Sequence, residues 1–298
     1  MSIAMPDAVT PFLFEHRNVR GAWVEIDAGV AEMLGHRDYS PDVRRLVGES
    51  CAAVALLAAQ TAFAGRLSLQ FQRGRGAVKL LVAQSDEKLN VRAMAKADAG
   101  AAGTLDTLMS GGVLGLAIEG ARGGQDYQAL VEARGATLAA ALEGYFLQSE
   151  QLPTRLCLSG GAERLAGILI QRLPARQGVR DTDEDTAHWE HLQALFATLS
   201  PDELGRCDVR DLMLKLFPGE DVRVFRHKPV QLVCRCSHAS ISAMLVSLGR
   251  GELEQILAER GEVEVTCEFC GKVYRYSTGE MQELFAAIEA KASAATKH

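Results

Sequence analysis

The sequence predicts an α+β fold in three parts: an N-terminal sheet with packed helices, a helical linker and a small C-terminal module with four cysteines. Three observations support this prediction. Short strand-like segments joined by turns fill much of the first 175 residues, which favours a mixed or antiparallel sheet. Residues 176–185 lack apolar periodicity, and four of the seven cysteines form two close pairs near the end of the chain. The predicted parts are residues 1–175, 176–230 and 231–298.

The first part is predicted to be one sheet covered by helices. Residues 12–26 alternate as in a strand, with Gly21 at a bulge or bend. A long helix is predicted over residues 41–64, because Pro41 suits a first helical turn and apolar residues recur at helical spacing until Gly65. A second helix is predicted over residues 137–149. Further strands are predicted at residues 67–72, 77–84, 89–95, 113–119, 127–131, 155–158 and 166–172.

The linker is predicted to begin with a hinge at residues 176–185. An apolar stripe at helical spacing follows and ends at Ser200-Pro201; it consists of Trp189, Leu192, Leu195, Phe196 and Leu199. A short helix at residues 209–217 and an extended arm at residues 222–233 lead to the module. In the module, helices are predicted at residues 240–248, 252–259 and 279–292, and strands at residues 262–266 and 273–276.

The overall composition is that of a globular protein. The chain has 298 residues, of which 48% are apolar and 23% charged, so a sizeable core and about two domains are expected. The longest strongly apolar run, residues 51–59, is far shorter than the ~20 residues of a membrane-spanning helix. The first residues also lack the basic and apolar segments of a signal peptide. We therefore expect a cytoplasmic protein that has no membrane partner.

The charge balance argues against nucleic acid as a partner. The chain carries 32 basic and 38 acidic residues, a net charge of −6. Residues 230–298 contain seven basic and nine acidic residues, whereas a phosphate-binding surface needs an excess of Lys and Arg. The acidic residues concentrate in residues 181–204, where seven acids occur without a single Lys or Arg.

The two cysteine pairs predict a zinc site. Cys234 and Cys236 form a CxC pair, and Cys267 and Cys270 form a CxxC pair thirty residues later. Four thiolates in two close pairs suit the closed tetrahedral geometry of structural Zn²⁺. The Gly271-Lys272 that follows predicts a zinc knuckle with a glycine at positive φ. We therefore predict one Zn²⁺ per chain in the reduced state, bound by these four cysteines.

The same sulfurs can carry redox chemistry, because the thiolate is also the form that attacks oxidants. A structural zinc site contributes about 10–16 kcal/mol of apparent free energy, whereas a module of ~65 residues alone rarely supplies more than about 3–5 kcal/mol. Oxidation that expels zinc is therefore expected to unfold the module. From spacing alone, a static zinc site remains the simpler interpretation, in a zinc-ribbon-like protein or nucleic-acid binder.

No motif indicates an enzyme. His188 and His191 are three residues apart, but a metalloprotease requires HExxH. The glycine pairs lack the GxxxxGK[ST] phosphate loop, and GxSxG is absent. Four cysteine ligands would also leave no open position on zinc for a catalytic water. Cys51 and Cys157 lie in apolar patterns and are expected to be buried, and nothing assigns a redox role to Cys207.

This arrangement resembles the bacterial redox-regulated heat-shock chaperone family, the thirty-three-kilodalton heat-shock holdase or chaperonin. The resemblance rests first on CxC, the thirty-residue spacer and CxxC-Gly. It extends along the whole chain, through Asn18–Gly21, Tyr145-Phe146 with Ser149–Arg155, and Ile256–Glu259 with Gly261-Glu262.

The resemblance implies an ATP-independent holdase that is inactive while zinc is bound. Oxidants would form the disulfides Cys234–Cys236 and Cys267–Cys270, zinc would leave, and the module and linker would lose structure. The protein would then dimerise and capture unfolding proteins during oxidative stress. The sheet face and the linker side chains Trp189, Leu192, Leu195 and Phe196 are the candidates for client binding.

The acidic stretch fits a linker that is stable only while docked. Repulsion among its like charges is expected to favour release and to keep the opened form in solution. Neutralising residues 181–185 is therefore expected to make the linker harder to release.

Overall fold

The structure, a computed structural model, describes residues 7–61, 63–72, 74–120, 127–133, 135–174 and 182–295. The chain forms two compact units, Met1–Val233 and Cys234–His298. Helices and mostly antiparallel strands build both units, which confirms the predicted α+β class. Among the described residues, no helix is long and apolar enough to cross a membrane.

The first sheet has the strand order β10-β1-β2-β9-β8, and β11 also pairs with β1. All of its pairings are antiparallel. Its strands are β1 (Ala8–Phe14), β2 (Val19–Ile26), β8 (Thr154–Gly160), β9 (Leu165–Arg172), β10 (Val222–Val224) and β11 (Lys228–Pro229).

The strand predicted over residues 12–26 is in fact the hairpin β1–β2. The predicted bulge or bend at Gly21 is also wrong, because Gly21 lies in regular register with Phe12 and Ile170. A Cβ at Gly21 would lie 2.1 Å from the Phe12 ring. The glycine therefore makes room for a neighbouring aromatic side chain.

The second sheet has the order β12-β5-β4-β3-β6-β7, in which only the short β12 runs parallel to its neighbour. The prediction of one sheet is therefore wrong, because β8 and β9 pair with the N-terminal hairpin instead. The strands of this sheet are β3 (Gly65–Gln72), β4 (Val78–Asp86), β5 (Asn90–Ala97), β6 (Val113–Gly120), β7 (Tyr127–Glu132) and β12 (Gln231–Leu232).

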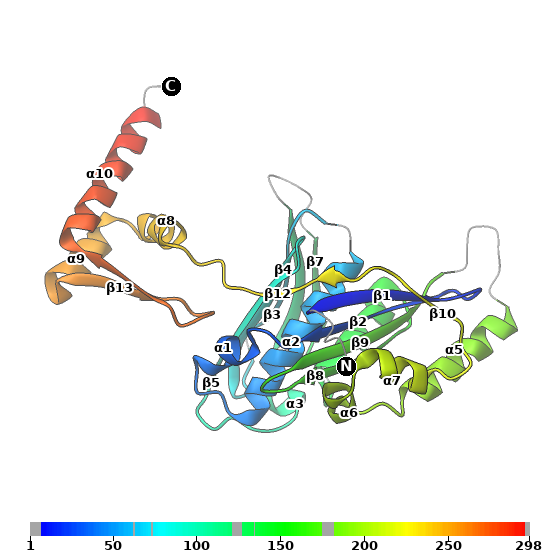
Figure 1. The fold of residues 1–298 in the computed structure, drawn as a ribbon. Coiled ribbons are helices and arrows are strands. Elements are labelled where there is room, and N and C mark those ends of the chain that lie inside the picture. The colour runs from blue at the N-terminus through cyan, green and yellow to red at the C-terminus, as the bar shows by residue number, and fades with distance from the viewer. Residues whose placement is uncertain are drawn as a thin grey trace, which may run out of the picture. The chain divides into compact units, whose positions relative to one another are not determined.

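Helix α2 (Pro41–Gln60) lies between the two sheets and contributes to the core beside both (Figure 1). It begins as predicted, with Pro41 in the first turn and the Ser40 side chain accepting a hydrogen bond from the Val43 amide. It ends at Gln60, before the predicted end. A Cβ on Gly160 would lie 2.0 Å from the Arg45 carbonyl oxygen, so glycine permits close contact between α2 and β8.

The helix predicted over residues 137–149 is divided into two parts. Helix α4 (Leu138–Tyr145) continues as the π-helical turn η1 (Phe146–Glu150). The turn ends at Gln151, which has a φ of 56°. Within the N-terminal part, two short helices that the sequence did not predict are α1 (Val30–Gly35) and α3 (Leu105–Leu108).

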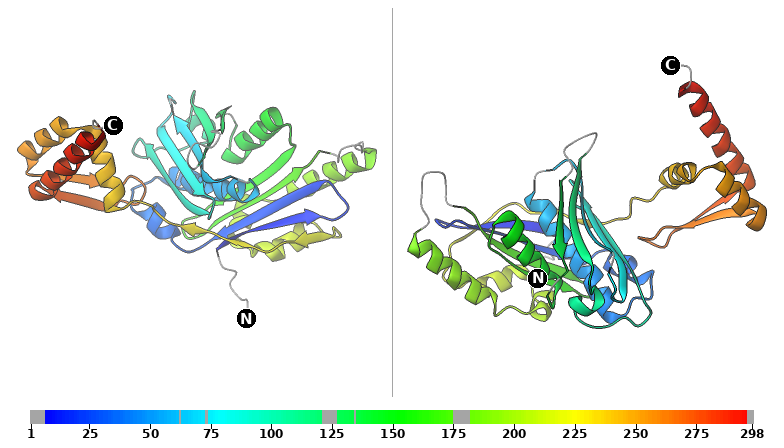
Figure 2. Two further views of the ribbon diagram at one scale, coloured as in Figure 1. Left: turned by 90° about the horizontal axis from the view of Figure 1, so that it is seen from above. Right: turned by 180° about the vertical axis from the view of Figure 1, so that it is seen from behind.

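The linker forms three helices, α5 (Asp183–Phe196), α6 (Pro201–Arg206) and α7 (Val209–Leu216). They pack on the face of the first sheet opposite to α2, so both faces of that sheet are buried. Figure 2 shows these yellow-green helices beside the blue strands β1 and β2. Helix α5 ends at Phe196, before the predicted end at Ser200-Pro201, and Pro201 starts α6.

The predicted hinge lies partly outside the described residues, and its remainder is helical. Thr182 caps α5 in a capping box with Asp185. Asp183, Glu184 and Asp185 occupy the first turn, where carboxylates complement the helix dipole, and Glu184 lies 2.9 Å from Arg17. Hydrogen bonds from Thr182 lower the pKa of Asp185. These contacts favour the docked α5 and act against the repulsion that the sequence analysis expects to release the linker.

Neutralising the three acids as Asn, Gln and Asn is therefore expected to loosen the start of α5. Hydrogen exchange of the amides of residues 183–188 should become faster in this variant, because the favourable interaction of the charges with the helix dipole and the contact of Glu184 with Arg17 are lost. Glu190→Gln, at an exposed position in the middle of the same helix, is the control. Slower exchange in the triple variant would restore the repulsion argument.

The C-terminal unit is built from α8 (His238–Leu248), α9 (Arg250–Arg260), the hairpin β13 (Glu262–Thr266) and β14 (Val273–Ser277), and α10 (Thr278–Ala295). All five predicted elements are present, although α8 and α9 each begin two residues early. The buried members of its core are few; they are Leu245, Leu253, Val263, Cys267, Tyr274, Tyr276, Met281 and Phe285.

Candidate metal centre

The four cysteines come from two turns of the C-terminal unit. Cys234 and Cys236 precede α8, whose first turn is closed by a capping box between Ser237 and Ser240. Cys267 and Cys270 lie in the turn between β13 and β14. In that turn the Gly271 amide donates to the Cys267 carbonyl at 2.8 Å, and the Cys267 amide donates to the Lys272 carbonyl at 2.9 Å. Gly271 has a φ of 69°, as the zinc-knuckle prediction requires.

The folded chain brings the four sulfurs together. All four Sγ atoms lie within 4.8 Å of one another, and this is the one such metal-ligand cluster among the described residues. Cys234 Sγ is 3.6 Å from Cys267 Sγ, and Cys236 Sγ is 3.4 Å from Cys270 Sγ. A tetrahedral site with Zn–S bonds of about 2.3 Å needs S···S separations of about 3.8 Å. The cluster could therefore hold a metal ion of this size with four sulfur ligands.

Tyr274 also contacts the cluster, and its role was not predicted from the sequence. Its hydroxyl donates a hydrogen bond to Cys236 Sγ at 3.2 Å. Burial acts to raise the pKa of the Cys236 thiol, but hydrogen bonds from Tyr274 and the other cysteines outweigh it and lower this pKa to about 7. Burial is the largest cause of the raised pKa values of Cys234 and Cys270. Strand alternation was the available signal, because it places Tyr274 and Tyr276 on one buried face.

The predicted client-binding side chains of the linker are inaccessible in this state. Trp189, Leu192 and Phe196 are buried, and Leu195 is partly buried against the same cluster. The sheet contributes an equally apolar surface to this contact, which includes Phe12, Phe14, Trp23, Ile168 and Ile170. Separation of linker and sheet would expose both surfaces together.

A partly buried ion pair fastens the linker beside this apolar contact. Arg164 lies 2.9 Å from Glu25 and also donates to the Cys207 carbonyl at 3.3 Å. Glu25 accepts a further hydrogen bond from the Val209 amide at 3.4 Å. Burial raises the pKa of Glu25, and the charge of Arg164 opposes this shift. These contacts bind the segment between α6 and α7 to the end of β2 and to the residue that precedes β9.

A cavity of about 260 Å³ lies where the end of α5 meets the sheet, and Glu49 and Cys157 contribute to its wall. Burial raises the pKa of Glu49 to about 7, although Arg45 opposes the shift. Glu49 is therefore protonated more readily in the folded than in the unfolded chain, whose carboxyl has a pKa of about 4.3. The protonated Glu49 carboxyl therefore stabilises the fold fully below about pH 4.3, and this stabilisation is lost as the pH rises through about 7.

Glu49→Gln is therefore expected to stabilise the protein increasingly as the pH rises. The gain in free energy of unfolding should be about 2–3 kcal/mol larger at pH 8 than at pH 5. Denaturant unfolding followed by tryptophan fluorescence measures this gain, because both tryptophans lie in the first unit. The exposed Glu163→Gln is the control, and a pH-independent gain would contradict the assignment.

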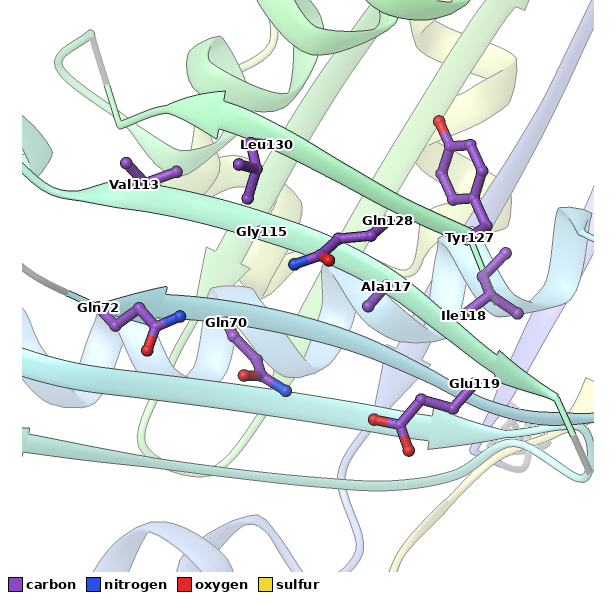
Figure 3. Close-up of a pocket in the computed structure, with 10 residues that line it drawn as sticks. All are labelled: Gln70, Gln72, Val113, Gly115, Ala117, Ile118, Glu119, Tyr127, Gln128 and Leu130. Atoms are coloured by element: carbon purple, nitrogen blue, oxygen red, sulfur yellow. The ribbon is translucent and has the colours of Figure 1, made fainter. Parts of the chain in front are cut away.

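The open face of the second sheet carries a shallow groove of about 430 Å³ over β3, β6 and β7 (Figure 3). Its wall combines the amides of Gln70, Gln72 and Gln128 with apolar side chains. Leu130, at 67% exposure, and Tyr127 are open to solvent. This groove lies on an open sheet face, which is one of the surfaces considered for client binding in the sequence analysis.

The other three cysteines lie apart from the metal cluster. Cys51 and Cys157 are buried as predicted, and burial raises the pKa of each thiol to about 12. Both are therefore poorly ionised at neutral pH. Cys207 lies between α6 and α7 and is partly exposed.

Comparisons with known proteins agree with one another. A family model described as Hsp33 protein matches residues 7–277. The chain is 39% identical over 298 residues to the 33 kDa chaperonin of Azotobacter vinelandii, covering 98% of this chain and 99% of that protein. It is 36% identical over 291 residues to the 33 kDa chaperonin of Pseudomonas paraeruginosa, covering 96% and 97%. The crystal structure of the 33 kDa chaperonin from Thermotoga maritima has a similar fold, with a TM-score of 0.78, 22% identity, and coverage of 96% and 99%.

Proposed function

Because this chain belongs to the Hsp33 family, whose curated relatives are named chaperonins, we propose that it is a redox-regulated, ATP-independent holdase. It binds unfolding proteins after oxidation and protects them from aggregation during oxidative stress. The observation that carries this proposal is the cluster of four sulfurs within 4.8 Å in a unit with a very small core.

The four cysteines Cys234, Cys236, Cys267 and Cys270 are the proposed ligands of one zinc ion in the reduced chain. When bound, Zn²⁺ would keep the four sulfurs as thiolates and cross-link the two turns. The tight turn at Gly271 and the hydrogen bond from Tyr274 orient the sulfurs for this role. The module depends on this cross-link, because few other side chains are fully buried in it.

The proposed switch is the formation of the disulfides Cys234–Cys236 and Cys267–Cys270. One thiolate attacks a peroxide oxygen, and the O–O bond breaks. Hydroxide is the leaving group, and the attacking cysteine becomes a sulfenic acid. The second thiolate attacks that sulfur, and a second hydroxide leaves as the S–S bond forms. The formation of each disulfide thus transfers two electrons from two thiolates to one peroxide molecule. This pairing follows the family, and all four sulfurs lie near enough for it.

Loss of the module would act on the linker through the arm that precedes Cys234. The arm pairs with β1 through β10 and β11 and with β5 through β12. Its last hydrogen bond joins the Val233 amide to the Val91 carbonyl at 2.9 Å. Unfolding that spreads back along this arm would remove strands from both sheets and free the linker helices next to it.

The surfaces proposed to capture clients are those that the docked linker covers, together with the groove of Figure 3. Trp189, Leu192, Leu195 and Phe196 provide the linker side. The active form is proposed to be a homodimer in the cytoplasm. It needs no catalytic residue, and its acidic charge disfavours nucleic acid as a partner.

Disulfide mapping tests the proposed switch. The chain loaded with one equivalent of zinc is treated with peroxide under mildly unfolding conditions, and the released zinc and the linked peptides are quantified. We expect one zinc released per chain and the two links within the CxC and CxxC pairs. Zinc retention with all four thiols oxidised, or links mainly between Cys234 and Cys267, would contradict the proposed chemistry.

A further inference from the structure

Two histidines of α5 face one carboxylate in the docked linker. His188 and His191 are three residues apart, so they lie on the same side of the helix. His188 Nε2 is 2.9 Å from one oxygen of Glu220, and His191 Nε2 is 4.0 Å from the other. This cluster has no part in the cysteine switch.

The fold holds two of the three side chains in place. His188 is only 10% exposed, and its ring stands edge-on to Phe14 at 6.3 Å. Glu220 is 17% exposed and follows Gly219, whose φ of 82° closes the turn between α7 and β10. The Glu220 amide also donates to the Phe217 carbonyl at 3.3 Å. His191 is different, because its side chain is 56% exposed to solvent.

We propose that His188, His191 and Glu220 form a second divalent-metal site, which takes an imidazole-preferring ion such as Zn²⁺. Tetrahedral Zn²⁺ with bonds of about 2.0–2.2 Å places neighbouring ligand atoms about 3.3 Å apart. Glu220 faces the two imidazoles with different oxygens, at 2.9 and 4.0 Å, so His191 must move closer before all three residues can bind one ion. Two imidazoles and one carboxylate favour zinc over the oxygen-preferring Mg²⁺ and Ca²⁺, and water completes the shell.

The metal completes a site that the docked linker has only partly assembled. Among the described residues, only the four cysteines already have all their ligand atoms at mutual metal-binding distances. At the linker site the bound ion draws in the exposed His191, while His188 and Glu220 keep their positions. The ion also replaces the direct contact between His188 and Glu220 with a bond to each.

Such an ion would fasten the linker in its docked state. Both histidines lie on α5, whereas Glu220 lies in the turn after α7 that leads into β10. Release of α5 separates the ligands, so the ion binds only the docked form. At a free metal concentration 100 times the dissociation constant, the docked state gains about 100-fold over the released state. This regulatory consequence rests on the proposed holdase function, but the metal binding does not.

Equilibrium dialysis of the full chain against Zn²⁺, with the cysteine site already filled, tests the binding. We expect a second zinc equivalent in the natural chain and in His227→Ala, which alters another exposed histidine. His191→Ala should lose this second equivalent and keep the first, because its exposed side chain contributes little to folding. A single equivalent in the natural chain, or an unchanged second equivalent in His191→Ala, would overturn the proposed site.

Hydrogen exchange of α5 tests the regulatory consequence separately. Adding Zn²⁺ beyond the first equivalent should slow exchange in the natural chain by at least tenfold and leave His191→Ala unchanged. Equal exchange rates with and without the second zinc would refute the fastening role. Absence of holdase activity after oxidation would instead refute the proposed function, because neither zinc measurement depends on it.

Discussion

Replacing Cys267 by serine is expected to abolish tight zinc binding and to unfold residues 234–298 even under reducing conditions. Cys267 is the most buried of the four cysteines and also belongs to the small core of this unit. A structural zinc site contributes about 10–16 kcal/mol of apparent free energy, whereas the core of so small a module supplies about 3–5 kcal/mol. Loss of one ligand therefore removes the main support of the unit.

Metal analysis and hydrogen exchange of the two units measure this effect. Exchange in residues 234–295 should approach that of an unfolded chain, while the α2 core should remain protected. Cys207→Ser is the matched control, because Cys207 lies outside the cluster, and it should keep one zinc. Full, tight zinc occupancy in Cys267→Ser would refute the ligand assignment.

Leu192→Asp is expected to release the linker and to produce holdase activity without oxidation. Leu192 is completely buried between α5 and the first sheet. An unpaired carboxylate there costs on the order of 3–5 kcal/mol, which exceeds what the docked contact can absorb locally. Zinc should stay bound, because the substitution lies in the first unit and the cysteines in the second.

Tryptophan fluorescence and aggregation of an unfolding client measure this release. Trp23 and Trp189 both lie in the buried contact between linker and sheet, so a red shift reports its loss. Ala194→Asp adds the same charge at an exposed position of α5 and should leave both readouts unchanged. A zinc-bound Leu192→Asp protein with exposed tryptophans but no suppression of aggregation would contradict the proposed client surface.

The metal centre could be predicted from the sequence because its geometry is mostly local. The spacings of CxC and CxxC place each pair within one turn, and Gly271 marks the positive φ that the second turn needs. The hydrogen bond from Tyr274 was missed because it joins residues 38 positions apart. Sequence spacing carries no direct signal for such a contact, although strand alternation restricts the candidates.

The division into two sheets was not predictable in the same way. Short turns indicate which neighbouring strands pair, but β2 pairs with β9 across most of the first unit. One signal was present, because seven of the eight residues of β9 are buried, with apolar side chains on both faces. A strand in a sheet with one open face should instead alternate apolar and polar residues. The linker that covers the second face explains this pattern.

The acidic stretch shows why a charge count alone does not predict the behaviour of the linker. A run of like charges favours separation only if the charges have no ordered partners. Here the capping box at Thr182 and the contact of Glu184 with Arg17 give the acids defined structural roles. The position of an acid within a helix, which composition does not reveal, decides the sign of its effect.

The most direct test of the redox holdase follows zinc release and client aggregation on one purified sample, before and after peroxide treatment under mildly unfolding conditions. We predict that zinc is lost as suppression of aggregation appears, and that a thiol reductant with added zinc reverses both changes. Zinc retention, or zinc loss without any suppression, would contradict the account and leave a protein with a static structural zinc site.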